Sequence, residues 1–218
     1  MNDKIELKFY WQNRKQNAEE VARQVKSVMG ALNSFSPLFN NFDWRTSSDS
    51  VTNYDAFAGI SVSKIKEALE YSKKRDDMDA EGYAKIGYSI IMYNDISQDI
   101  HVDINMSLGA SSPRITNTFI LIMSSRFFDE QSYFRLFKIL AEILSPEWGC
   151  LDSKHFRDVH GVSMNRRGWI FFTQSQPKSI PQFFTTENIS TNGFIVYPKS
   201  VSNLFDENFI QKYKEIVD

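Results

Sequence analysis

The sequence predicts an α+β fold: a mostly antiparallel β-sheet with helices packed on one face, in a single domain over residues 1–218. Three strand-like stretches follow one another between residues 84 and 123. Two other stretches, 17–34 and 129–144, repeat apolar residues at helical spacing. A run of strands flanked by helices differs from the strict alternation of strand and helix in a parallel α/β fold.

The middle strand of the three has the clearest pattern. Its residues alternate between an apolar set (Ile100, Val102, Ile104, Met106 and Leu108) and a polar set (Asp99, His101, Asp103, Asn105 and Ser107). A period of two over ten residues is typical of a strand with one face on a core and the other in water. Turn-forming residues at 94–95 and 109–113 predict that the three strands are antiparallel neighbours.

The chain opens with a predicted strand at 5–11, where apolar and polar residues alternate. Asn17, with Glu20 three residues later, resembles a capping box and begins a predicted helix. Apolar residues at helical spacing continue this helix to about residue 34, and Pro37 ends it.

Residues 36–60 are expected to be irregular, with Ser63 as the cap of a short helix after them. That helix ends in the charged segment 73–81. Beyond the three strands, Asp129 is the expected cap of the second long helix, which Pro146 closes.

The last third of the chain predicts a strand around 150–151 and a polar stretch at 154–167. Two strong strands follow at 168–173 and 193–198. A C-terminal helix, capped by Asp206, completes the predicted order.

Composition excludes several classes of protein. The 25 basic and 27 acidic residues nearly balance, so no global field marks a nucleic-acid or membrane binder. A single cysteine, Cys150, excludes intramolecular disulfides and a thiolate metal cluster, and packing is its expected role. The N-terminus lacks an apolar signal region and no long apolar run occurs, so we expect a soluble, cytoplasmic protein.

One candidate metal site is the face formed by Asp99, His101 and Asp103. These residues share one side of the predicted strand, about 7 Å apart at each step. Side chains on one straight strand stand parallel, whereas metal ligands must converge on the ion. A solvated strand face is therefore the favoured interpretation, and no stoichiometric metal is expected.

Two shorter motifs are candidate catalytic sites. Glu147, Asp152 and Lys154 echo the acid-acid-x-lysine arrangement of metal-dependent nucleases, in which carboxylates hold Mg²⁺. The two acids are too close in sequence for a hairpin between them. Ser61 and Lys64 form an S-x-x-K motif without its usual partner motifs, which favours a helix cap. No convincing catalytic set can be assembled from these motifs.

Two charged segments could serve contacts. The basic residues Lys154, His155, Arg157, His160, Arg166 and Arg167 could hold a phosphate backbone, although a solvated loop is favoured. The acidic residues Asp76, Asp77, Asp79 and Glu81 form either a polar connector or a patch facing a basic partner.

Short motifs along nearly the whole chain, from about Ile5 to Val217, resemble the Imm52 family of immunity proteins of bacterial polymorphic-toxin systems. Arg45 and Tyr93 depart from the family pattern, which has tyrosine and tryptophan there. The matching motifs are LKFYWQNR with Arg14, Phe42 followed by Trp44, GYSIIMYN, SPEWGCLDS, GWIFFT, NGFIVYP and FDENFIQKYKEI.

The resemblance implies a cytoplasmic antitoxin without catalysis or cofactor, which binds and neutralises a cognate toxin. Toxins paired with this family typically resemble restriction-endonuclease-fold DNases, delivered by contact-dependent or type VI secretion. Two other functions stay open: a metal-dependent hydrolase or nuclease, and a nucleic-acid-binding module using residues 154–167. The sequence leaves the oligomeric state open.

A nuclease presents basic residues to its substrate, so an inhibitor gains from acidic and aromatic groups. Residues 42–57 contain both acidic and aromatic side chains, and residues 76–81 contain acidic ones. We expect contacts from Asp43, Trp44, Asp49, Tyr54 and Asp55 in the first stretch, and steering from Asp76, Asp77, Asp79 and Glu81 in the second. Trp44 has a core position as its alternative.

Overall fold

The computed structural model describes residues 4–12, 14–40, 42–46, 52–53, 59–97, 100–160, 168–177, 180, 182, 184–189 and 193–200. The chain divides into two compact units. Unit 1 comprises Met1–Phe9 with Ile122–Asp218, and unit 2 comprises Tyr10–Leu121. Each unit is α+β with strands that pair antiparallel, as the sequence predicts. The assignment of residues 1–218 to a single domain stays a prediction.

Unit 2 contains most of the predicted strand meander. Its strands are hydrogen-bonded in the order β3-β2-β4-β5-β6. In chain order its elements are α1 (Ala18–Phe35), the 3-10 turn η1 (Pro37–Phe39), β2 (Asp43–Thr46), β3 (Thr52–Asn53), α2 (Val62–Tyr71), the 3-10 turn η3 (Arg75–Asp77), β4 (Tyr88–Ser97), β5 (Ile100–Leu108) and most of β6 (Thr116–Ser124).

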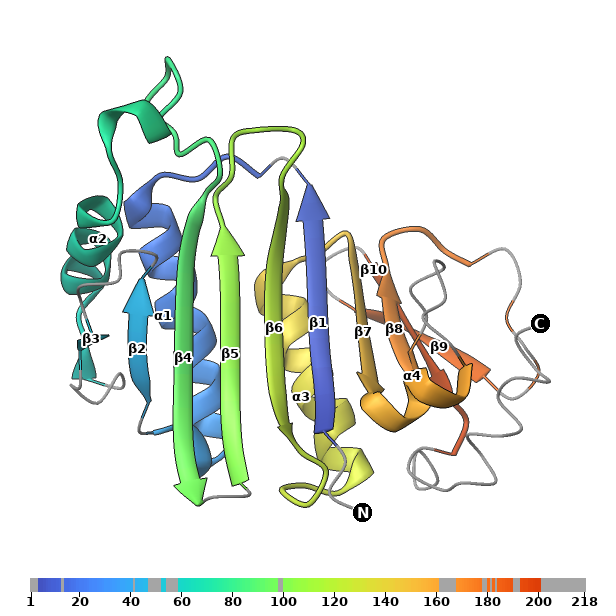
Figure 1. The fold of residues 1–218 in the computed structure, drawn as a ribbon. Coiled ribbons are helices and arrows are strands. Elements are labelled where there is room, and N and C mark those ends of the chain that lie inside the picture. Colours follow the sequence, from blue (N-terminus) through green and yellow to red (C-terminus); the bar gives the residue numbers. More distant parts are fainter. Residues whose placement is uncertain are drawn as a thin grey trace. The chain divides into compact units, whose positions relative to one another are not determined.

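The register of β2, β4 and β5 separates two faces of this sheet. Trp44, Met92 and Ile104 stand opposite one another across the three strands, and all are buried. Asn94, on the same side of β4 as Met92, donates a hydrogen bond to the carbonyl oxygen of Leu38 in η1 at 3.1 Å. Even-numbered residues of β4 therefore face the layer that contains α1 and η1, which lies behind the strands in Figure 1.

Unit 1 begins with β1 (Lys4–Gln12), whose residues to Phe9 belong to this unit. From β1 the strands are hydrogen-bonded in the order β1-β7-β8-β10-β9. The remaining elements are α3 (Glu130–Leu144), β7 (Trp148–Ser153), α4 (Lys154–His160), β8 (Ile170–Thr173), β9 (Phe184–Ile189) and β10 (Gly193–Pro198).

Two helices of unit 1 lie on opposite faces of its strands. Phe9 of β1 stacks on Phe137 of α3, with ring centroids 4.8 Å apart. Glu6, on the other face of β1 by alternation, contacts Arg157 of α4 instead. The long helix α3 thus covers the apolar face, and the short α4 lies on the polar one (Figure 1).

Most elements with a strong local signal are confirmed. Asn17 and Glu20 form the predicted capping box of α1, with both reciprocal hydrogen bonds present. Asp129 caps α3 by accepting a hydrogen bond from the Ser132 amide at 2.7 Å. The short helix α2 begins two residues earlier than predicted: Ser61, rather than Ser63, accepts the capping hydrogen bond from the Lys64 amide.

Elements that depend on distant pairing were not predicted. Two short strands, β2 and β3, lie within the stretch 36–60 that was expected to be irregular. The helix α4 lies in the predicted polar stretch 154–167, and β9 in a predicted connection. β9 has only its two end residues buried, so it lacks the apolar alternation that reveals a strand. The predicted C-terminal helix capped by Asp206 falls outside the described residues.

Candidate functional site

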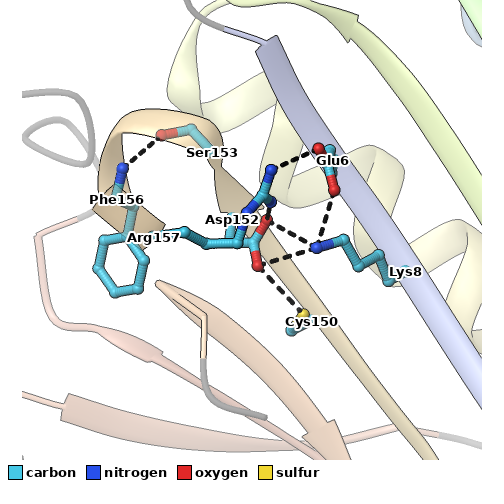
Figure 2. Close-up of polar contacts among 7 residues, drawn as sticks. All are labelled: Glu6, Lys8, Cys150, Asp152, Ser153, Phe156 and Arg157. Carbon is cyan, nitrogen blue, oxygen red and sulfur yellow. Dashed lines mark hydrogen bonds and ion pairs between the residues drawn. The ribbon is translucent and has the colours of Figure 1, made fainter. Parts of the chain in front are cut away.

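The most concentrated polar cluster in the described part of the chain joins β1, β7 and α4 of unit 1 (Figure 2). Alternation along β1 puts Glu6 and Lys8 on the face opposite to Phe9. Asp152 comes from β7, which ends where α4 begins. One helical turn into α4, Arg157 reaches back over the strands.

The four charged side chains form a closed ring of alternating sign, defined here as the ion-pair ring (Glu6, Lys8, Asp152 and Arg157). Lys8 Nζ lies 2.8 Å from Glu6 Oε2 and 3.2 Å from both carboxylate oxygens of Asp152. Arg157 Nη2 lies 2.6 Å from Glu6 Oε1, and Nη1 contacts Asp152 Oδ1. The ring has no net charge, so each carboxylate is neutralised in place.

The start of α4 fixes the position of Arg157. Ser153 Oγ accepts a hydrogen bond from the Phe156 amide at 3.0 Å, which satisfies one free N–H of the first turn. The Phe156 ring packs edge-on against Trp169, with centroids 5.2 Å apart. These two contacts and the ion-pair ring together hold α4 on the strands.

Burial and the neighbouring cations shift the pKa values of the two carboxyl groups in opposite directions. Burial acts to raise the pKa of Glu6, but hydrogen bonds from Lys8 and Arg157 outweigh it and lower the pKa below its usual value. At Asp152, whose side chain is only 7% exposed, burial prevails over both cations and raises the pKa. Burial also strongly raises the pKa of Cys150, whose Sγ lies 3.9 Å from Asp152 Oδ2. A thiol held neutral is a poor nucleophile, so packing fits Cys150.

The ring contains the groups of a metal-dependent nuclease in an unfavourable arrangement. Glu6 and Asp152 could contribute oxygen ligands, and Lys8 could steady a water molecule. The Arg157 guanidinium, however, contacts both carboxylates. A divalent cation would have to displace it. Within the described residues, no group of three or more His, Cys, Asp or Glu side chains is arranged to hold a metal ion.

The acid-acid-lysine set considered from the sequence is not assembled. Glu147 and Lys154 are exposed, whereas Asp152 between them is buried. Asp152 forms ion pairs with Lys8 and Arg157, the same two cations that contact Glu6. Alternating charges on the predicted opening strand were the one sequence signal for this ring.

Of the candidate metal ligands Asp99, His101 and Asp103, the structure describes the side chain of Asp103. Ile104 is fully buried, as predicted, and Asp103 beside it is partly exposed on the other face. Asp99 and the side chain of His101 fall outside what the structure describes. The interpretation of this set as a solvated face stays a prediction for those two residues.

The first group of predicted partner contacts is divided by the fold. Trp44 is 2% exposed and belongs to the core of unit 2, so the core alternative applies to it. Asp43, its neighbour on β2, is partly exposed on the opposite face. Asp49, Tyr54 and Asp55 lie outside the described residues.

In the second group, two of the four carboxylates hold the loop together. Asp77 accepts a hydrogen bond from the Lys74 amide at 2.8 Å, and Asp79 accepts from the Glu81 and Tyr83 amides at 2.9 Å each. Glu81 pairs with Lys15 at 3.0 Å in an exposed contact. Asp76 is exposed.

The basic stretch 154–167 is also divided. Arg157 turns inward to the ion-pair ring, while Lys154 is exposed and His155 partly exposed. Residues 161–167, with Arg166 and Arg167, lie outside the described residues, as does the side chain of His160. One of the cations offered for a phosphate backbone is therefore used to hold α4.

Comparisons with known proteins give a fold and no family. No family model matches the sequence, and no curated protein matches it. Among solved structures, the Pseudomonas aeruginosa T6SS protein PA0821 is similar, with a TM-score of 0.50 and 11% identical residues. The similarity covers 95% of this chain and 75% of that chain. At this identity it shows a shared fold, and the resemblance to Imm52 rests on the sequence motifs.

A helix that spans a membrane needs about 20 consecutive apolar residues. Within the residues that the structure describes, no helix is long and apolar enough to cross a membrane.

Proposed function

We propose that this chain is an immunity protein that binds and neutralises a secreted toxin in the bacterial cytoplasm, without catalysis. The toxin is a nuclease, with a restriction-endonuclease fold as the expected class. The observation that carries the proposal is the shared fold with a protein named for type VI secretion, which spans 95% of this chain. The Imm52-like motifs point to the same biological setting.

The contacts of the ion-pair ring fit a structural role better than a role in catalysis. Its two carboxylates and two cations neutralise one another, and together they hold α4 on β1 and β7. Charged groups used in this way stabilise a surface. This use of the two carboxylates and two cations agrees with the proposed function, which requires no catalysis.

The test is rescue of growth. The gene next to the one for this chain, expressed as a toxin in Escherichia coli, should stop growth, and co-expression of this chain should restore it. The two proteins should also co-elute in gel filtration when the toxin carries an inactivating substitution. Growth arrest that persists despite a well-expressed chain, together with separate elution, would contradict the proposal.

The runner-up is a metal-dependent hydrolase or nuclease built on Glu6, Asp152 and Lys8, because the structure brings these groups together. Its test is cleavage of DNA or RNA by the purified chain with Mg²⁺ or Mn²⁺. Activity that EDTA abolishes and that Asp152→Asn removes would favour this function. The proposed immunity function expects no cleavage under either condition.

A further inference from the structure

The two helices on the strands of unit 1 cover chemically different layers. On one face, Phe9 of β1 stacks on Phe137 of α3, and most of the buried side chains of α3 are apolar. On the other face, Arg157 of α4 contacts the carboxylates of Glu6 and Asp152, whose side chains are 17% and 7% exposed. α3 thus covers an apolar layer, whereas α4 covers a charged one (Figure 2).

This difference makes α4 the easier of the two helices to remove from the strands. Exposing apolar surface to water is unfavourable in proportion to its area, so opening at α3 would lose much of the stability of unit 1. Ions instead regain hydration when they are exposed, and the desolvation cost of a buried ion pair can exceed the attraction between its members. Hydration therefore offsets part of the loss when Arg157 leaves the two carboxylates.

Three contacts among the described residues hold α4 in place. Arg157 belongs to the ion-pair ring, Ser153 Oγ accepts a hydrogen bond from the Phe156 amide at 3.0 Å, and the Phe156 ring packs against Trp169. Along residues 154–158, the buried side chain is that of Phe156. A helix of 7 residues does not persist without tertiary contacts, so α4 should unfold once they open.

We propose that α4 is a strap that opens by itself while β7 and α3 stay folded, and that Arg157 is the latch of this strap. In the closed state the ion-pair ring is neutral. In the open state the ring loses one of its two cations, and its carboxylates are hydrated. Elements with few apolar contacts commonly open at a free energy below that of global unfolding. The strap is a property of unit 1 and does not depend on the proposed function.

The experiment is amide hydrogen exchange of the full chain, followed by NMR at several urea concentrations below the unfolding transition. After correction for intrinsic rates, the amides of α4 should exchange about tenfold or more faster than those of β7 and α3. Their rates should also depend little on urea, because local opening exposes little surface.

Two results would overturn the strap. Equal rates and an equal urea dependence for α4 and β7 would show that α4 opens only when the whole unit unfolds. Exchange of the α4 amides at the rate of an unstructured peptide would show that the closed state is not populated in solution.

The latch is tested with three variants. Arg157→Ala should speed exchange of the α4 amides by about tenfold or more, because it leaves two carboxylates with one cation. Their weak urea dependence should be kept. Lys154→Ala, the matched control, removes an exposed cation from the same helix and should change exchange by less than about twofold. Arg157→Lys keeps the charge but lacks the planar fork that donates to both carboxylates, so its rate should lie between those of Arg157→Ala and the unaltered chain.

Thermal unfolding by circular dichroism checks that each variant is folded. If Arg157→Ala exchanges like the unaltered chain, or if Lys154→Ala speeds exchange of α4 equally, Arg157 is not the latch.

Discussion

The Arg157 guanidinium lies 2.6 Å from the Glu6 carboxylate, although 151 residues separate the two in the chain. This contact ties a seven-residue helix to the first strand of the protein. A helix that short is not stable in isolation, because nucleation costs more than one or two turns return. The conformation of α4 therefore depends on tertiary contacts.

Arg157→Ala should lower the free energy of unfolding by about 1–3 kcal/mol, because it leaves two carboxylates with one cation in a half-buried site. The value lies below that of a fully buried pair because the Arg157 side chain is 24% exposed. Lys66→Ala, which removes an exposed cation near Glu19, is the control and should cost less than about 0.5 kcal/mol. Urea unfolding measures both, and equal losses would show that the ion-pair ring contributes no more than a surface pair.

Glu6 should make stability depend on pH in the acid range. Its pKa is lowered in the folded state from the usual value of 4.5, so its contribution to stability is present above that pH and is lost as pH falls through the folded value. Glu6→Gln should lower stability at neutral pH and flatten the decline below pH 4.5. The pKa of Asp152 is raised instead, in part by the charge of Glu6, so the difference between the two proteins reports Glu6 together with its effect on Asp152. Curves of stability against pH that stay parallel for Glu6→Gln and the unaltered chain would contradict this assignment.

Local patterns in the sequence were enough to predict the elements that have a clear apolar period or a helix cap of their own. The alternation in β5 gives both its strand character and its buried face, as Ile104 shows. The Asn17 and Glu20 pair gives the start of α1. Such elements are encoded by neighbours in sequence, so one sequence is sufficient to find them.

The ion-pair ring and the buried position of Trp44 could not be found in this way, because each depends on pairing between distant strands. Glu6 and Lys8 are visible as alternating charges, but nothing local indicates that Asp152 lies beside them. Trp44 was a plausible exposed anchor until pairing of β2 with β4 placed it opposite Met92. Which face a short strand exposes is decided by its partner's register, and that information is not local.

The two faces of β5 give a direct test of register. Ile104→Asp should prevent stable folding, at a cost above about 4 kcal/mol, because it buries an unpaired carboxylate in the core. Asn105→Asp adds the same group one residue later on the partly exposed face and should cost less than about 1 kcal/mol. Solubility and thermal unfolding distinguish the two, and comparable damage from both would reject the register.

Gly87, directly before β4, should not tolerate a side chain. Its φ is +73°, and an added Cβ would lie 2.6 Å from the carbonyl oxygen of Leu108. Gly82 also has a positive φ, +86°, but an added Cβ there meets nothing within 4 Å. Gly82→Ala should therefore cost only backbone strain, about 1 kcal/mol, and Gly87→Ala clearly more. Chemical denaturation of the two variants measures the steric part as their difference, and a difference near zero would contradict the close approach.

The loop around η3 should affect how fast the toxin binds more than how long it stays bound. Asp77 and Asp79 accept backbone hydrogen bonds there, so substituting them would disturb the loop itself. Asp76 is exposed and can be reversed in charge without that complication. Long-range attraction between opposite charges accelerates encounter and is screened by salt.

Asp76→Lys should therefore slow association with the inactivated toxin by several-fold at low salt, and by less at high salt, while the dissociation rate stays nearly constant. Asp158→Lys makes the same charge reversal on exposed α4 and controls for the change in net charge. Stopped-flow or surface plasmon resonance at two ionic strengths gives both rates. A faster dissociation of Asp76→Lys would make Asp76 a direct contact of the toxin, and identical association rates for the two variants would leave only the effect of net charge.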